Sequence, residues 1–375
     1  MNSLYIHIPF CLRKCHYCSF SSNVSSTAIQ RQYVKALSLE LDSLQPTNRG
    51  RALSTLFVGG GTPTCLEPKY LLSIIDQCRD IFGFVEDAEV SVEANPGTVD
   101  GAYFEKLRRA GVNRLSIGVQ TFIDSELTAI GRLHSKQQAI DAYRAAKNAG
   151  FTNINIDLMS GIPGQTVASW AESLDQVLSL SPQHLSLYQL MVEEGTHFGR
   201  LAEKGELDLP DEDEILEMDE RTRVVCQRED FIQYEVSNFA LEGYQCRHNI
   251  NYWDNNDYLA AGAAAVSFVD GVREKRFIDV SEYVEKVLSG SSVIMETECL
   301  TLEESFRETV IVGLRMKRGV SISNLESRYG LTPGKYYGSI LTAFQDSGML
   351  ELSHQYLRIT EKGWPFSNSI MAELV

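Results

Sequence analysis

Short apolar segments alternate with amphipathic helical segments from residue 3 to about residue 190, and this alternation constrains the fold more than any other feature. The expected strands cover residues 3–8, 54–58, 88–93, 114–119, 153–158 and 184–190. A helix is expected over 30–44, where the apolar face holds Val34, Leu37, Leu41 and Leu44. Repeated strand–helix–strand units predict parallel strands with right-handed crossovers. Six units make an α/β fold, an open partial (β/α)6 barrel.

The pattern changes after residue 195, and two further regions are expected. The middle region, 196–297, begins with an acidic segment interpreted as a surface helix over 203–222 and continues with an α+β extension. Residues 298–375 combine helical segments with the strand pair MLEL and YLRI, which predicts a small winged-helix-like domain. The expected domains are therefore a barrel of residues 1–195, a middle region of 196–297 and a C-terminal domain of 298–375. A chain of 375 residues is long enough for this division.

The net charge of −16 disfavours nucleic acid as a partner, because phosphates are repelled over most of such a surface. The region from 298 onward carries 8 Lys/Arg and 9 Asp/Glu, which is not the basic surface of a DNA-binding wing. No apolar run is long enough to span a membrane, and the first residues do not resemble a secretory signal. We therefore expect a cytoplasmic protein whose membrane contact is at most transient, while oligomerisation stays open.

Three of the eight cysteines, Cys11, Cys15 and Cys18, form a C-x3-C-x2-C motif directly after the first expected strand. Thiolates are the usual ligands of iron–sulfur clusters, and three of them on a four-iron cluster leave one iron open to a small molecule. Structural zinc and chance spacing are the alternatives, but structural zinc normally takes four ligands. The motif thus predicts a [4Fe–4S] cluster, and the five scattered cysteines are interpreted as small buried residues.

Polar residues and glycines follow the other expected strands, at the edge where the ligand sites of such folds lie. A glycine-rich turn comes after the second strand, and carboxylates, an amide and a guanidinium come at or near the ends of later strands. These chemical types suit the ammonium, hydroxyl and carboxylate groups of a zwitterionic ligand. The candidate binding residues are Gly60, Gly61, Thr62, Glu93, Gln120, Arg132 and Asp157.

The segment YIHIPFC-x3-C-x-YC resembles the start of the radical S-adenosylmethionine (SAM) superfamily, in its coproporphyrinogen-oxidase-like branch. The resemblance implies that the open iron chelates the amino and carboxylate groups of SAM, and that an electron from the cluster cleaves SAM to a 5′-deoxyadenosyl radical. It matches Tyr5 and Tyr17 to aromatic residues of the family, assigns Gly60, Gly61 and Thr62 to the methionine moiety, and matches the four other candidates as SAM-binding residues.

Two features separate the members of this branch. Phe20 stands where the coproporphyrinogen dehydrogenases carry a fourth cysteine, and residues 248–253, HNINYW, match the HNxxYW motif of the HemW heme chaperones. The segments YQL, YEVSNF and FSNSIMAEL are also similar to HemW proteins, so the resemblance to the HemW family covers nearly the whole chain. Val266 is a departure, because many relatives have histidine at this place.

The motif makes His248 a candidate axial ligand of heme, because imidazole is the usual partner of heme iron. Tyr252 and Trp253 would supply flat apolar surface for a porphyrin. The alternative is a structural histidine beside a buried aromatic pair. Cys246 is a weaker candidate, and His7 is interpreted as a core residue or a neighbour of the cluster.

The resemblance implies a heme-binding chaperone that carries a [4Fe–4S] cluster and SAM, holds heme as cargo, and passes it to respiratory cytochromes or other hemoproteins. An oxygen-independent coproporphyrinogen III dehydrogenase is the alternative, against which Phe20 and HNxxYW argue. A radical enzyme acting on nucleic acid is a third possibility, disfavoured by the charge.

Overall fold

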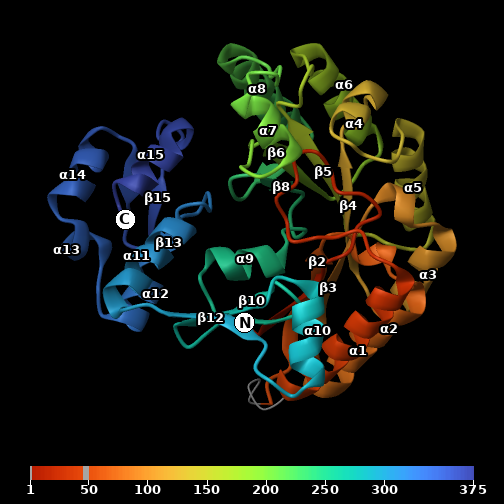
Figure 1. Ribbon diagram of the computed structural model, residues 1–375. Helices are drawn as coiled ribbons and strands as arrows, with labels where there is room; N and C mark the ends of the chain where they lie inside the picture. The colour runs from red at the N-terminus through yellow and green to blue at the C-terminus, as the bar shows by residue number, and fades with distance from the viewer. Residues whose placement is uncertain (1, 45–49) are drawn as a thin grey trace.

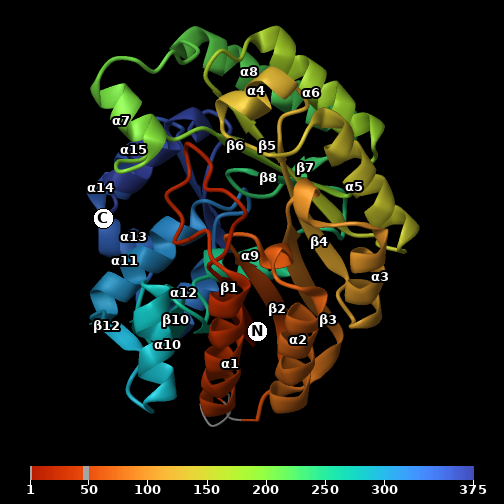
Figure 2. The same ribbon diagram turned by 45° about the vertical axis from the view of Figure 1, so that its right-hand side comes forward.

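The computed structural model describes residues 2–44 and 50–375, and its centre is one nine-stranded sheet (Figures 1 and 2). Six parallel strands form the expected open barrel. They are β1 (Ser3–Ile8), β2 (Leu53–Gly60), β3 (Phe84–Ala94), β4 (Arg114–Gln120), β5 (Ile154–Ser160) and β6 (His184–Gln189). The crossover helices are α1 (Thr27–Leu44), α2 (Pro68–Phe82), α3 (Gly101–Arg109), α4 (Asp124–Ala129), α5 (Lys136–Asn148) and α6 (Val167–Ser179). Short 3-10 turns, η1 (Pro63–Cys65) and η2 (Pro96–Thr98), follow β2 and β3.

The main core lies between the sheet and these helices, as the apolar pattern predicts. In α1, Val34, Leu37 and Leu41 are buried and Leu44 packs against the same core. The helix starts at Thr27, three residues before the expected start. The neighbouring α2 begins with Pro68, whose fixed backbone angle suits a first helical turn. The strands between the helices are buried along most of their length, so the barrel is held mainly by apolar packing.

Three short strands from the middle region extend the sheet at both edges. β9 (Leu259–Ala261) pairs in parallel with β1, and β8 (Asn238–Ala240) pairs antiparallel with β6 and with β7 (Ile232–Gln233). The sequence predicted only six strands here, because segments of two or three residues are too short to show a period of two. The barrel and the expected middle region therefore share one sheet.

The acidic segment forms a helix, but not over the expected residues 203–222. After α7 (His197–Glu203) the chain is irregular, and α8 spans Glu212–Arg228. Pro210 precedes the helix, and the Asp211 side chain caps it by accepting a hydrogen bond from the backbone N–H of Glu214. The capping residue thus fixes the start of the helix nine residues after the position that acidity alone predicted.

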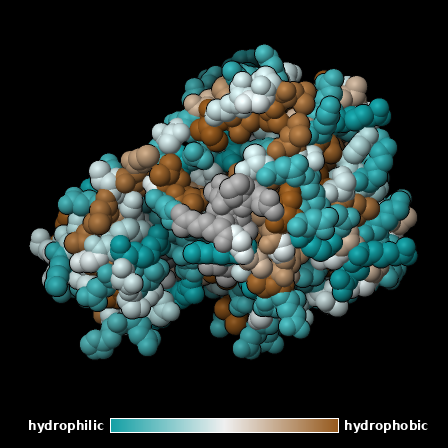
Figure 3. Space-filling view, turned by 90° about the horizontal axis from the view of Figure 1, so that it is seen from below, coloured by the Kyte–Doolittle hydropathy of each residue, from teal (hydrophilic) through white to brown (hydrophobic). Residues whose placement is uncertain are grey.

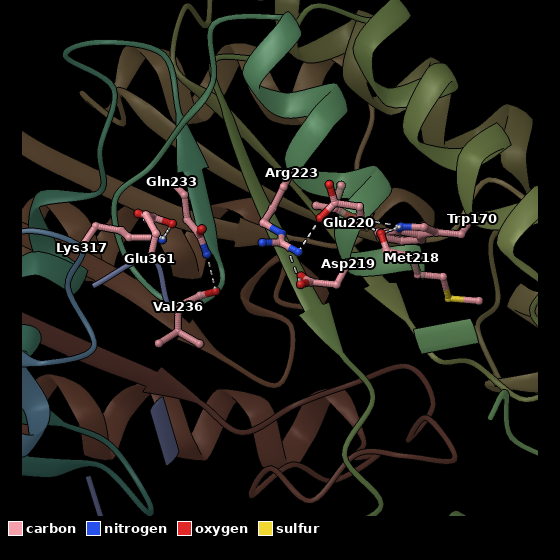
Figure 4. Close-up of polar contacts among 10 residues, drawn as sticks. Trp170, Met218, Asp219, Glu220, Arg223, Gln233, Val236, Lys317 and Glu361 are labelled. Carbon is pink, nitrogen blue, oxygen red and sulfur yellow. Dashed lines mark hydrogen bonds and ion pairs between the residues drawn. The ribbon is translucent and has the colours of Figure 1, made fainter. Parts of the chain in front are cut away.

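One face of α8 is buried against α6. The Trp170 indole N–H of α6 donates to the Met218 carbonyl at 3.2 Å and to the Thr222 hydroxyl at 3.0 Å. On the exposed face, Arg223 pairs with Asp219 and Glu220 (Figure 4). The helix is therefore amphipathic rather than wholly solvated, and its acidic residues mark only the outer face.

The rest of the middle region contains α9 (Arg247–Trp253), α10 (Val280–Leu288) and an antiparallel sheet of β10 (Val266–Val269), β11 (Val272–Arg276) and β12 (Ile294–Cys299). A buried ion pair ties this region to α1: Arg276 Nε lies 2.8 Å from Glu40 Oε1. Glu40 also accepts hydrogen bonds from the Tyr283 hydroxyl at 2.5 Å and from the backbone N–H of Gly262 at 2.8 Å. One carboxylate therefore joins α1, β11, α10 and the residue that follows β9.

The C-terminal region has its own core, built around Phe306, Leu325 and Leu357. Its helices are α11 (Leu302–Gly313), α12 (Ile322–Tyr329), α13 (Pro333–Tyr337), α14 (Ser339–Asp346) and α15 (Ser367–Ala372), with the 3-10 turn η3 (Trp364–Phe366). The expected strand pair is confirmed as β14 (Leu350–Leu352) and β15 (Tyr356–Ile359), joined by β13 (Val320–Ser321). Lys317 and Glu361 form an ion pair within this region (Figure 4). Helices on a three-stranded antiparallel sheet match the winged-helix-like expectation.

The face seen from below carries both hydrophilic and hydrophobic side chains (Figure 3). No helix in the described ranges is both long enough and apolar enough to cross a membrane.

Candidate functional site

The three motif cysteines lie on the loop that follows β1 and line one cavity of about 400 Å³. All three are free thiols and half-buried. Backbone hydrogen bonds hold the loop: Cys11 N–H donates to Asn23 at 3.1 Å, and Cys18 N–H donates to Cys15 at 3.2 Å. The loop also contacts α7, where Phe198 N–H donates to the His16 carbonyl at 3.0 Å. The three sulfur atoms are therefore presented to a cavity by a loop anchored on both sides.

The glycine turn after β2 brings backbone close to the cysteine loop. A Cβ atom at Gly61 would lie 2.7 Å from the Phe10 carbonyl oxygen and 3.0 Å from Cys11 Sγ. Gly60 has φ +118°, which side chains rarely allow, and its N–H donates to Glu93 Oε2 at 3.0 Å. Thr62 Oγ1 lies 3.7 Å from Cys11 Sγ. Gly60, Gly61 and Thr62 thus line the cavity beside the first cysteine, as expected.

Two carboxyl groups lie on the floor of the cavity, Glu93 of β3 and Asp157 of β5. Burial, with a smaller contribution from the neighbouring Asp157, raises the pKa of Glu93 to about 8. Burial also raises the pKa of Asp157, although its carboxylate accepts hydrogen bonds from Asn155 at 2.5 Å and from Ser116 at 3.2 Å. The cavity therefore offers two buried carboxyl groups that both accept hydrogen bonds and whose pKa values are both raised.

Arg132 links the cysteine loop to β4. Its guanidinium donates to the Gly118 carbonyl, and its Nη1 lies 3.5 Å from Cys15 Sγ. Its Nε is buried and has no hydrogen-bond partner among the described residues. The sequence placed Arg132 at the end of a short helix, but α4 ends at Ala129 and Arg132 lies three residues beyond it. Gln120, at the end of β4, has φ +75° and lines the same cavity.

The cavity contains the groups that a [4Fe–4S] cluster and SAM need. It combines three thiols, a guanidinium with a free N–H, and carboxyl, amide and glycine backbone groups. Tyr17 also lines it, beside Arg132 and the cysteines, and burial raises the pKa of its hydroxyl. In the described residues no three His, Cys, Asp or Glu side chains are arranged for a single metal ion. The donor set therefore fits the two groups predicted from the sequence.

A second cavity, of about 460 Å³, lies next to the first, and Glu93, Ser116, Asp157 and Tyr188 line both. Tyr5 faces this second cavity and not the cysteine cavity. Its hydroxyl lies 3.0 Å from His7 Nδ1. Tyr5, expected among the cofactor-binding residues, thus lines the neighbouring cavity and not the cysteine cavity.

His248 lies in the wall of the second cavity, at the N-terminal turn of α9, and is only 1% exposed. Its Nδ1 lies 2.8 Å from Thr55 Oγ1, and its Nε2 lies 2.9 Å from the Tyr252 hydroxyl. Burial lowers its pKa to about 3. Both ring nitrogens already have partners, so binding to a metal would require one of these hydrogen bonds to break. Trp253 lines neither cavity and packs instead near Tyr234 and Met316.

The polar residues that sequence analysis missed share one pattern. Along β4, β5 and β6, alternate residues point to the inside of the barrel, which is the period of a strand. The alternating polar residues include Arg114 and Ser116 of β4, Asn155 and Asp157 of β5, and Ser186 and Tyr188 of β6. The guanidinium of Arg114 is 2% exposed, and its Nε has no hydrogen-bond partner among the described residues. Polar residues at every second position of otherwise apolar strands were the available signal.

Known proteins resemble the chain over nearly all of its length. Residues 5–177 match the Radical SAM superfamily and residues 300–366 match the HemN C-terminal domain. The heme chaperone HemW of Bacillus subtilis is 35% identical over 99% of this chain and 98% of its own. HemW of Lactococcus lactis is 33% identical over 100% and 97%. The chain belongs to the HemW family.

A further HemW, from Escherichia coli, is 41% identical over 72% of this chain and 71% of its own. A solved structure of the radical SAM enzyme coproporphyrinogen III oxidase (HemN) from Escherichia coli has a TM-score of 0.87 and 26% identity, covering 100% of this chain and 89% of that one. The HemW family thus has the fold of a radical SAM protein, with the C-terminal domain type that is named after HemN.

In this HemW-family chain the two sets of predicted site residues separate into two cavities. The cysteine cavity collects the three thiols and eight of the predicted SAM-binding residues. These eight are Tyr17, Gly60, Gly61, Thr62, Glu93, Gln120, Arg132 and Asp157. Tyr5, His248 and Val266 line the second cavity. A ligand that spans both would pass Glu93, Asp157 and Tyr188.

Proposed function

We propose that this chain is a heme chaperone that carries a [4Fe–4S] cluster and SAM, and that it holds heme as cargo for delivery to hemoproteins. The observation that carries the proposal is the similarity to proteins named heme chaperone HemW over 97–100% of both chains. The cysteine cavity supports the part of the proposal that concerns the cluster and SAM, because its donor set suits a cluster and a zwitterionic ligand. Respiratory cytochromes or other hemoproteins are the predicted recipients.

Cys11, Cys15 and Cys18 would hold the cluster, and the cavity residues around them would hold SAM. Gly60 and Gly61 allow backbone to approach the ligand, Arg132 offers its guanidinium to a carboxylate, and Glu93 and Asp157 suit ammonium or hydroxyl groups. When bound, the cluster would supply an electron and an open iron for SAM. Arg132 also lies against Cys15 Sγ, where its positive charge would stabilise the thiolate.

The chain offers a matched control for the cluster. Cys65 lines the same cavity as the motif cysteines but lies outside the motif, and burial raises the pKa of its thiol to about 11. We expect Cys15→Ala to lose most of its iron and sulfide after anaerobic reconstitution, whereas Cys65→Ala keeps both. Equal iron and sulfide contents in the two variants would contradict the assignment of the cluster.

The second candidate function is oxidative decarboxylation of coproporphyrinogen III. It is favoured by the similarity in fold to the coproporphyrinogen III oxidase of Escherichia coli. Phe20 argues against it, since this residue lines the cysteine cavity where the dehydrogenases carry a fourth cysteine. The test is to give the reconstituted protein heme and coproporphyrinogen III separately, with reductant and SAM. We expect heme binding without decarboxylation, and multiple turnovers to protoporphyrinogen would favour the second function.

His248 is a candidate axial ligand of heme, and its buried position sets a condition for that role. The hydrogen bond to Tyr252 occupies Nε2, and the hydrogen bond to Thr55 occupies Nδ1. Ligation through His248 therefore requires a change of conformation around α9. A site that is more accessible than His248 would bind heme without this change of conformation.

A further inference from the structure

Exposed apolar side chains surround the mouth of the cysteine cavity. Leu12 and Phe20 come from the cysteine loop, Leu133 follows α4, and Met191 follows β6. They are 55%, 65%, 56% and 71% exposed, and all four line the cavity. We call these four residues the apolar rim. They come from three separate segments of the chain, so the rim is a feature of the folded surface and not of one loop.

The apolar rim brings four large exposed side chains together around one cavity. Single exposed apolar residues are common, but a group of large ones around one cavity marks a binding surface. The floor of the same cavity is polar, with Glu93, Asp157 and Arg132. The chain as a whole is strongly charged, at −16. A ligand that fits the mouth must therefore have an apolar body large enough to cover the rim.

Two cationic side chains also line the cysteine cavity. Arg13 and Lys14 are exposed and line the cavity between Cys11 and Cys15. Within the described residues neither forms an ion pair with a carboxylate, and the Lys14 ammonium donates to the Phe20 carbonyl at 3.1 Å. Glu193, beyond Met191, adds a carboxylate to the lining, besides Glu93 and Asp157. Free cations beside an apolar rim complement a ligand that is flat and apolar in its body and anionic at one edge.

We propose that the apolar rim is where heme binds, with Met191 as the axial ligand of the iron and Arg13 and Lys14 paired with the propionates. The inference rests on the proposed chaperone function and names the site of its cargo. Phe20 offers an aromatic ring to the macrocycle, and the thioether of Met191 is a type of sulfur that ligates heme iron.

The rim meets the requirements of a carrier better than the second cavity does. Met191 is 71% exposed, so heme reaches it without rearrangement, whereas His248 is 1% exposed with both ring nitrogens hydrogen bonded. A rim covers one face of a flat ligand and leaves the other accessible to a recipient protein. Heme bound there would also lie over the mouth of the SAM cavity, so that cargo and SAM share one opening.

The first test measures heme binding to the reconstituted protein by absorption spectroscopy. The variants are Met191→Leu, which keeps apolar volume and removes the sulfur, and Phe20→Ala. The control is Met295→Leu, since Met295 is 42% exposed on β12 and lines neither cavity. We expect Met191→Leu to change the heme spectrum, and Phe20→Ala to weaken binding about tenfold. The control should match the wild type, and iron and sulfide contents should stay normal throughout.

The second test separates the two cations from the apolar surface. Heme dimethyl ester keeps the macrocycle and lacks the propionate charges. Wild-type protein should bind heme about tenfold more tightly than the ester, and this preference should disappear in Arg13→Gln/Lys14→Gln. An equal preference in wild type and double variant would overturn the assignment of the propionates.

The outcomes distinguish this inference from the proposed function. If wild-type protein binds no heme, the chaperone function fails and the inference with it. If it binds heme, but Met191→Leu and Phe20→Ala leave spectrum and affinity unchanged while His248→Ala loses binding, heme lies in the second cavity and the rim assignment alone is wrong.

Discussion

At the scale of single residues, Glu93 connects the two cavities and carries a protonation change near neutral pH. Burial and the nearby Asp157 raise its pKa to about 8 in the folded protein, against an ordinary value of 4.5. The folded state therefore binds more protons than the unfolded state between these values, and its stability falls as pH rises through this window. Above about pH 8 the loss from Glu93 is complete.

We expect Glu93→Gln to flatten this decline. The difference in slope should be at most about 1.4 kcal/mol per pH unit. Urea unfolding of wild type and variant at intervals from about pH 5 to about pH 9 measures it. Glu105→Gln is a control, since Glu105 is exposed on α3. Parallel curves for wild type and Glu93→Gln would show that this carboxyl titrates normally.

The environment of His248 predicts a large effect on stability. His248→Ala leaves a cavity and deprives Thr55 and Tyr252 of a buried partner, so it should lower the free energy of unfolding by about 2–4 kcal/mol. Tyr252→Phe removes only one hydrogen bond and should cost about 1 kcal/mol. Chemical denaturation measures both. A negligible cost for His248→Ala would mean that the side chain is not packed as described.

At the residue scale, only the site features that local patterns encode could be predicted from the sequence. The cysteine motif and the glycine turn were readable because their spacing is local. A buried structural His248 was one of the two interpretations, but its contacts were not readable. They depend on Glu89, which accepts hydrogen bonds from the N–H groups of Arg247 and His248 and so fixes the start of α9. These contacts join segments about 160 residues apart, and no local pattern encodes them.

At the scale of elements, the carboxylate of Glu40 is the main polar link between α1 and the middle region. It pairs with Arg276 and accepts from Tyr283 and Gly262, with almost no exposure to water. Glu40→Ala leaves a buried guanidinium without its partner and should cost about 3–5 kcal/mol.

A double variant tests whether the ion pair itself stabilises the fold, or whether only an unpaired buried charge destabilises it. Glu40→Leu/Arg276→Leu removes both charges and should be less destabilised than Glu40→Leu alone, because an unpaired buried charge costs more than the pair contributes. Urea unfolding of the two single variants and the double variant gives the coupling energy. Additive effects would show that Glu40 and Arg276 act independently.

The long strands and amphipathic helices were predictable, because each shows its own period over several residues. The strands β7, β8 and β9 have only two or three residues, so their pairing depends on the edges that the long strands leave open. The start of α8 depended on a cap at Asp211 rather than on the acidity of the segment.

At the scale of the whole molecule, the chain has two large apolar cores, one in the barrel and one in the C-terminal region. Phe104 and Phe306 are both fully buried, one in each core. Each change to alanine should cost about 3–5 kcal/mol locally. We expect Phe104→Ala to reduce the iron content after reconstitution and Phe306→Ala to preserve it. Equal loss of iron in both would indicate that the two cores unfold together.

The position of β1 in the sheet has a consequence for biosynthesis. β1 is not at an edge, since it pairs with β2 on one side and with β9, residues 259–261, on the other. The strand that leads into the cysteine loop is therefore synthesised well before its partner β9, and it completes its pairing only after residues 259–261 have emerged from the ribosome. Until then one side of β1 has open backbone groups, which exposes the nascent chain to mispairing. Assembly of the proposed cluster on a fully formed loop would then be a late event, after translation has passed β9.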